Sequence, residues 1–118
     1  SGVAMVSPIS TGDRAYGSLS GTSMSAPNVT GTLALLQELY HRRNNAFMRA
    51  STLKGLAIHT VDEAGPAQGP DYKFGWGLIN GERAARVITQ RGISTRIIER
   101  ALETGQVDTF NVIASGNG

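Results

Sequence analysis

The sequence predicts a mixed α/β fold in which a short strand precedes a long helix, two further helices and a β-hairpin. Three patterns lead to this prediction. An apolar run near the N-terminus is bounded by Gly2 and Pro8, as buried strands often are. Apolar residues recur at helical spacing from Val29 onward. Two β-prone stretches separated by a turn signal follow residue 94, which is typical of a hairpin.

The composition excludes several classes of protein. The 118 residues contain no cysteine, so neither a disulfide framework nor a cysteine metal site is expected. The net charge is +2, and the one basic cluster, His41-Arg42-Arg43, falls at a predicted helix end, where cations suit the helix dipole. We therefore expect no nucleic-acid partner. No apolar run reaches the roughly 18 residues that span a bilayer, and the first residues lack the pattern of a signal peptide. We expect no membrane segment and a chain that starts inside a domain.

The first strand is expected over Val3–Ser7, as a buried strand. A loop is expected over Ser10–Ser18, because Thr11-Gly12-Asp13 and Gly17-Ser18 are turn signals.

The string Gly21-Thr22-Ser23-Met24-Ser25-Ala26-Pro27 stands directly before the long helix. Gly21 permits a tight turn, and Pro27 is expected in the first helical turn, where its missing N–H costs little. Ser23 would lie among free backbone N–H groups at the positive end of the helix dipole. That place suits a hydroxyl that attacks a carbonyl and leaves an oxyanion. The alternative is a plain N-cap, which only satisfies orphan N–H groups.

This string resembles the nucleophile motif of the subtilisin-like serine proteases, the subtilases, which is Gly-Thr-Ser-Met-(Ala/Ser)-x-Pro. The resemblance implies that Ser23 is the catalytic nucleophile, supported by the motif residues Gly21, Thr22, Met24 and Pro27. It also implies an α/β domain with a parallel sheet, protein or peptide substrates, and secretion. Tyr16–Ser20 fit the family's approach to the serine, whereas Asn28 stands where many subtilases have histidine. Subtilases often bind calcium, although no metal site or other cofactor is evident in this sequence.

Three helices are expected after the motif. The first covers about Ser23–Arg43, and Gly31 within it suggests close packing against another backbone. The second covers about Phe47–Thr60, and a loop follows over Val61–Tyr72. The alternation of large side chains and glycines from Phe74 to Ile79 indicates a place where backbone crosses backbone. Asn80 is the expected N-cap of a third helix over about Gly81–Gln90. The stretch from His59 to Asn80 resembles the end of a subtilase catalytic domain.

After residue 91 the pattern changes to two expected strands, Thr95–Arg100 and Val107–Ala114, around a turn at Glu103-Thr104-Gly105. They resemble the first hairpin of the jelly-roll domain that follows some subtilase catalytic domains. The predicted organisation is therefore the C-terminal portion of a catalytic domain over residues 1–91 and the start of an incomplete β domain over 92–118.

A serine protease also needs a base, an acid that holds the base, and oxyanion donors. The family's Asp-x-Gly and His-Gly-Thr segments do not occur in these residues. His41 and His59 both follow the serine, in the wrong order for the family's base, so helix-end exposure is expected for the first and packing or a turn hydrogen bond for the second. Asp62, Glu63 and Asp71 show no paired-carboxylate or metal spacing.

The resemblance therefore implies a serine endopeptidase whose base and acid lie upstream. We expect the chain on its own to be inactive and to self-associate. The alternative is a catalytically decayed subtilase-like module that binds or scaffolds. A third reading, an esterase with a Gly-x-Ser-x-Gly elbow, fails because Ser25 replaces the final glycine.

Overall fold

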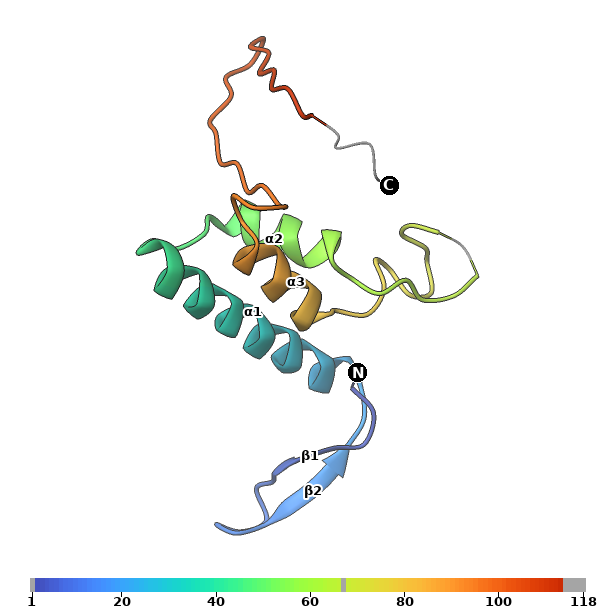
Figure 1. The fold of residues 1–118 in the computed structure, drawn as a ribbon. Helices are drawn as coiled ribbons and strands as arrows, with labels where there is room; N and C mark the ends of the chain where they lie inside the picture. Colours follow the sequence, from blue (N-terminus) through green and yellow to red (C-terminus); the bar gives the residue numbers. More distant parts are fainter. Residues whose placement is uncertain (1, 67, 114–118) are drawn as a thin grey trace.

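The computed structural model describes residues 2–66 and 68–113. Its elements are a two-stranded hairpin, β1 (Met5–Pro8) and β2 (Tyr16–Leu19), followed by α1 (Thr22–Asn44), α2 (Ala50–His59) and α3 (Gly81–Thr89). In Figure 1, α2 and α3 lie on one side of α1, and the hairpin extends away from the N-terminal end of α1. The predicted mixed α/β class is confirmed.

The N-terminal hairpin differs in two ways from the single buried strand and loop that were expected there. β1 pairs antiparallel with β2, with Met5 opposite Leu19 and Pro8 opposite Tyr16, so residues expected to form a loop form the second strand. The backbone N–H of Ile9 donates to the Ala15 carbonyl at 3.0 Å and closes the turn. The strand is also not buried, because the Val6 side chain is 69% exposed. The described strands pair only with each other, so the parallel sheet implied by the resemblance stays a prediction.

The three helices lie where the apolar spacing predicts them, within three residues at each end. The Asn45 residue that follows α1 has a left-handed φ of 52°, and its N–H donates to the His41 carbonyl at 2.8 Å. Asparagine tolerates that conformation at a helix end. The Gln37 side chain fixes the position of Met48 in the connection between α1 and α2. Gln37 Nε2 donates to the Met48 carbonyl at 2.9 Å, and Gln37 Oε1 accepts the Met48 N–H at 3.0 Å.

The core is small and lies between the helices. Leu36 and Tyr40 of α1 pack with side chains of α2, of α3 and of the connection between α1 and α2. The buried apolar residues are Leu36, Tyr40, Met48, Leu56, Ala84 and Ile88. All but Met48 lie on the apolar helix faces read from the sequence, which is the direct consequence of helical periodicity. Met48 lies outside a helix and carries no periodic signal.

The predicted C-terminal hairpin is absent from the described residues. Residues 96–113 contain no strand, although the expected turn forms, with the Gln106 N–H donating to the Glu103 carbonyl at 3.0 Å. Arg100 and Asp108 form an ion pair across this turn. The strand prediction is wrong here because two strands without a third strand or a packing surface are marginal in water. The last residue of the second expected strand, Ala114, lies outside the described residues.

Candidate functional site

The motif serine stands at the start of α1. Gly21 is the residue before the helix, with φ 154° and ψ 173°, a conformation that L side chains rarely adopt. The Met24 and Ser25 N–H groups both donate to the Gly21 carbonyl, at 3.1 and 3.2 Å. Ser23 is the second helical residue and is exposed. Its own N–H belongs to the first turn, whose amides have no intrahelical acceptor and carry the positive end of the dipole.

The structure rules out the N-cap alternative for Ser23 and corrects the expected place of Pro27. The N-cap is Gly21 and no side chain caps the helix, so Ser23 does not serve as an N-cap. Pro27 lies in the second helical turn, five residues after Thr22, and not in the first turn. Since proline has no N–H, the Ser23 carbonyl lacks the amide donor that residue 27 would otherwise supply. The turn therefore has an exposed hydroxyl and a locally interrupted hydrogen-bond ladder.

Neither His41 nor His59 lies beside Ser23. His41 lies 18 residues further along the same helix, or about 27 Å along its axis at 1.5 Å per residue. The His41 ring is half-buried and stacks on Phe47, with ring centroids 4.4 Å apart, so the expectation of simple exposure is wrong. His59 ends α2 and is exposed at a cavity lined by α2, Val87 and residues 96–100.

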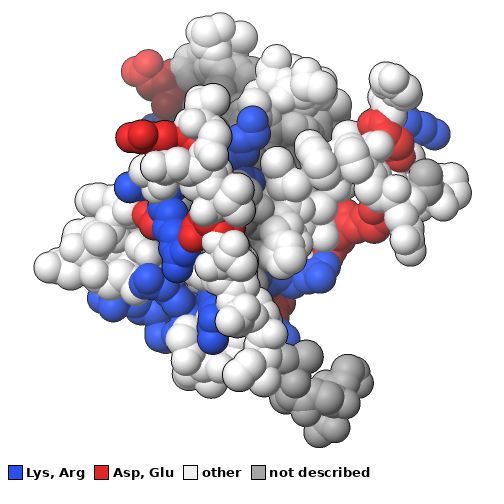
Figure 2. Space-filling view, turned by 90° about the horizontal axis from the view of Figure 1, so that it is seen from above, with Lys and Arg blue, Asp and Glu red and all other residues white. Residues whose placement is uncertain are grey.

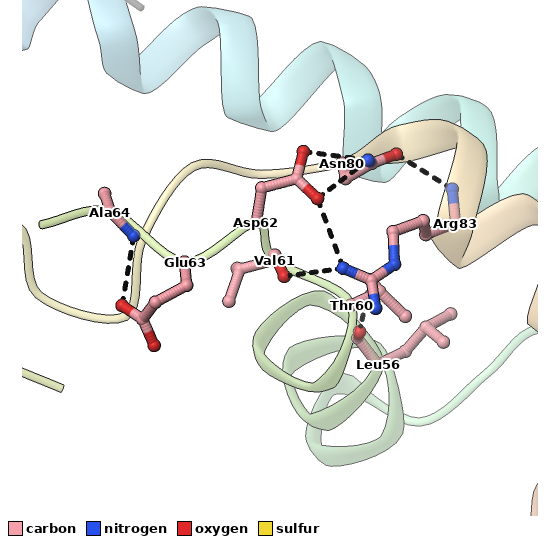
Figure 3. Close-up of polar contacts among 8 residues, drawn as sticks. All are labelled: Leu56, Thr60, Val61, Asp62, Glu63, Ala64, Asn80 and Arg83. Carbon is pink, nitrogen blue, oxygen red and sulfur yellow. Dashed lines mark hydrogen bonds and ion pairs between the residues drawn. The ribbon is translucent and has the colours of Figure 1, made fainter. Parts of the chain in front are cut away.

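The loop carboxylates bond to groups of this chain, as Figure 3 shows for Asp62 and Glu63. Asp62 accepts the Asn80 side-chain amide at 2.9 and 3.1 Å and pairs with the Arg83 guanidinium at 3.2 Å. The Asn80 oxygen in turn accepts the Arg83 N–H at 2.9 Å, which confirms Asn80 as the N-cap of α3. This network closes the base of the loop between α2 and α3, where Asp62 and Leu78 exchange backbone hydrogen bonds.

The other two carboxylates bond within the loop itself. Glu63 accepts the N–H groups of Ala64 and Gly69 at 3.0 and 2.8 Å. Asp71 accepts those of Lys73 and Phe74 at 2.8 and 2.6 Å. Among residues 2–66 and 68–113, no three His, Asp or Glu side chains lie close enough together to hold a metal ion. Calcium binding stays an expectation from the family resemblance.

A cavity in the described part of the chain also lies away from the serine, which is not among its lining residues. It has a volume of about 410 Å³ and is lined by α2, Val87 and the segment after α3. Figure 2 shows Lys and Arg side chains mixed with Asp and Glu side chains on one face of the molecule. No helix in the described part of the chain has the length and apolarity needed to cross a bilayer.

Comparison with known proteins identifies the family. The model of the subtilase family matches residues 5–77. The autotransporter lipoprotein NalP of Neisseria meningitidis is 44% identical over 66 residues, which is 56% of this chain and 6% of that protein. An extracellular serine protease of Serratia marcescens is 40% identical over 65 residues, 55% of this chain and 6% of that protein.

A plant relative is similar over a larger share of the chain. The subtilisin-like protease SBT3.13 of Arabidopsis thaliana is 38% identical over 93 residues, covering 71% of this chain and 12% of that protein. The chain thus spans 6–12% of the length of these three relatives. The family match covers more than half of the 118 residues, including the whole serine motif. The chain therefore belongs to the subtilase family.

Proposed function

We propose that this chain is part of a serine endopeptidase in which Ser23 is the nucleophile. The observation that carries the proposal is the position of the motif serine, exposed in the first turn of α1 and free of any capping role. Membership of the subtilase family supports it. Its substrates would be proteins or peptides, as for proteases in general.

The chemistry follows from the turn. Ser23 Oγ attacks the scissile carbonyl carbon, while a base takes the hydroxyl proton and later returns it to the leaving amine. The Ser23 N–H donates to the oxyanion that develops, and the dipole of α1 favours the same negative charge. The base, its orienting acid and further oxyanion donors belong to parts of a longer protein outside these 118 residues. The domain division at residue 91 remains part of this proposal.

We propose an extracellular location, because the relatives include an autotransporter lipoprotein and an extracellular serine protease. The 118-residue chain alone should hydrolyse no peptide, since removing the base or the nucleophile of such a triad costs about 10⁶ in turnover. Turnover by the isolated chain that disappears in Ser23→Ala would contradict this expectation.

Hydrolysis of casein by the full-length protein tests the proposal. We expect wild-type activity, and a loss approaching 10⁶-fold in Ser23→Ala. Ser25→Ala is the matched control, because the family motif allows alanine at that position and activity should persist. Failure of the correctly folded full-length protein to cleave any protein substrate would favour the alternative, a decayed subtilase that binds or scaffolds.

A further inference from the structure

The first described residues lie against the turn that carries the motif serine. Figure 1 shows the N-terminal end of the chain beside the first turn of α1. The Gly2 carbonyl accepts the Gly21 N–H at 2.8 Å. The Ser20 hydroxyl accepts the Ala4 N–H at 2.8 Å. Two hydrogen bonds in opposite directions thus join residues 2–4 to the two residues that immediately precede Thr22.

Gly2 is buried and has no room for a side chain. A Cβ on Gly2 would lie 2.2 Å from the Gly21 carbonyl oxygen and 2.9 Å from the Ser25 backbone nitrogen. Both are backbone atoms of the helix start, so they could move only if the turn itself moved. The close approach therefore couples the position of residue 2 directly to the residues on either side of Ser23.

Ala4 adds a sign of strain at the same place. Its φ of 51° lies in the left-handed region, which residues with a side chain rarely adopt. Such conformations cost free energy and persist where the surroundings hold them, often beside functional sites. Here the hydrogen bond from the Ala4 N–H to Ser20 holds the conformation.

We propose that Gly2, Ala4, Ser20 and Gly21 form a clamp that positions Ser23 for attack; this inference rests on the proposed function. The clamp residues touch neither substrate nor the reacting atoms. They act by fixing the helix start, and thereby the direction of the Ser23 hydroxyl and N–H. Small displacements of a nucleophile lower the rate of the chemical step steeply. The sequence marks Gly2 only as a strand boundary and Ser20 only as part of the approach to the serine, so the structure alone reveals their contacts.

The test uses the full-length protein with Ser20→Ala, which removes the acceptor, and Ser20→Thr, which keeps it. Ser18→Ala is the control, because Ser18 is exposed on the adjacent strand and its hydroxyl has no part in the clamp. Two readouts are needed: the saturation kinetics of labelling by a fluorophosphonate probe, and deuterium exchange of the peptide spanning residues 20–25. A Gly2→Ala variant should show a larger effect, but the Ser20 series decides the question if that variant fails to fold.

We expect Ser20→Ala to lower the maximal labelling rate by about tenfold to a hundredfold, with the half-saturating probe concentration unchanged and faster exchange of the 20–25 peptide. Ser20→Thr should restore both values, and Ser18→Ala should change neither. Faster exchange with an unchanged labelling rate would overturn the positioning role and leave a purely structural contact. Unchanged exchange and labelling would overturn the clamp itself. A wild-type protein that is not labelled at all would overturn the proposed function and, with it, the positioning role.

Discussion

Two glycines that look equally conspicuous in the sequence occupy opposite environments. A Cβ on Gly31, inside α1, would meet nothing within 4 Å, so the predicted close packing there is wrong for the described residues. A Cβ on Gly77 would lie 2.3 Å from the Asp62 carbonyl oxygen, and Gly77 has φ 107°. The prediction that backbone crosses backbone near residue 77 is therefore confirmed. The sequence shows where glycines occur, but it does not show which of them packs against another part of the backbone.

Alanine substitutions at these two positions should change stability in opposite directions. Gly31→Ala should raise the free energy of unfolding by about 0.5–1 kcal/mol, because alanine is the better helix former. Gly77→Ala should lower it by about 1–3 kcal/mol, because the backbone conformation is strained for a residue with a side chain. Urea denaturation of the full-length protein measures both. A destabilising Gly31→Ala would show that another part of the protein packs against this face of α1.

At the scale of elements, the segment after α3 is bonded to the start of α2 through Glu99, which lies fifty positions after Arg49. Glu99 Oε1 accepts the N–H of Arg49 at 2.8 Å, and Arg49 precedes α2 without a side-chain cap of its own. Nearby, Ile97 packs against the core and the Thr95 hydroxyl donates to the Val87 carbonyl at 2.7 Å. Glu99 accepts the N–H of the N-cap residue, and thus does for α2 what the glutamate of a capping box does for other helices.

Glu99→Ala should therefore loosen this segment. The loss of a cap costs about 1 kcal/mol, so trypsin should cleave after Arg96 roughly fivefold faster at neutral pH. Glu103→Ala is the matched control, since that exposed residue lies beyond the contact with α2 and should leave the cleavage rate unchanged. Equal rates in wild type and Glu99→Ala would mean that Ile97 and Thr95 alone hold the segment.

The same contact should depend on pH. The Thr52 side chain and then the backbone N–H of Arg49 lower the pKa of Glu99, the charges of Arg49 and Arg91 add to this effect, and burial opposes it. Arg96 and Arg100 line the adjoining cavity. A lowered pKa stabilises the contact above the unfolded value of about 4.3, and this stabilisation is lost as the pH falls through the folded value.

The NMR shift of the Arg49 amide proton reports this titration. We expect a midpoint below about 4.3 in wild type and no such step in Glu99→Ala. A titration midpoint at or above the ordinary pKa of glutamate would contradict the hydrogen bond between Glu99 and the Arg49 N–H.

The helices and the strands were not equally predictable. Leu36, Leu56 and Ile88 each belong to an apolar pattern of helical spacing, in α1, α2 and α3 respectively. Because helical hydrogen bonds are local, the sequence alone places these three helices. Strand pairing depends on which partner is present. That is why Tyr16–Leu19 forms an unexpected strand and residues 107–113 do not form an expected one. For the site, the motif predicted the location of Ser23, but the contacts of Gly2 and Ser20 come from residues separated in sequence.

As a whole molecule, the chain leaves much of its surface open. Its accessible area is 9281 Å² and its mass is 12.4 kDa, whereas a folded monomer of that mass has about 6100 Å². Its radius of gyration is 18.2 Å, against about 13.5 Å for a compact domain of this length. Exposed apolar side chains on the hairpin and the C-terminal segment, such as Val6, Leu19 and Ile113, contribute to this open surface.

The 118-residue chain on its own should therefore self-associate, because exposed apolar patches drive association. Sedimentation should show species larger than the monomer at micromolar concentration, and a dye that binds apolar surface should fluoresce. A monomer that unfolds in one sharp cooperative transition would contradict this expectation.

The measurement that tests the central claim most directly is the location of a covalent fluorophosphonate adduct on the full-length protein, read by peptide mass spectrometry. The account predicts a single adduct on Ser23, absent from Ser23→Ala and retained in Ser25→Ala. An adduct on another serine, or none on a correctly folded protein, would contradict the assignment of Ser23 as the activated nucleophile.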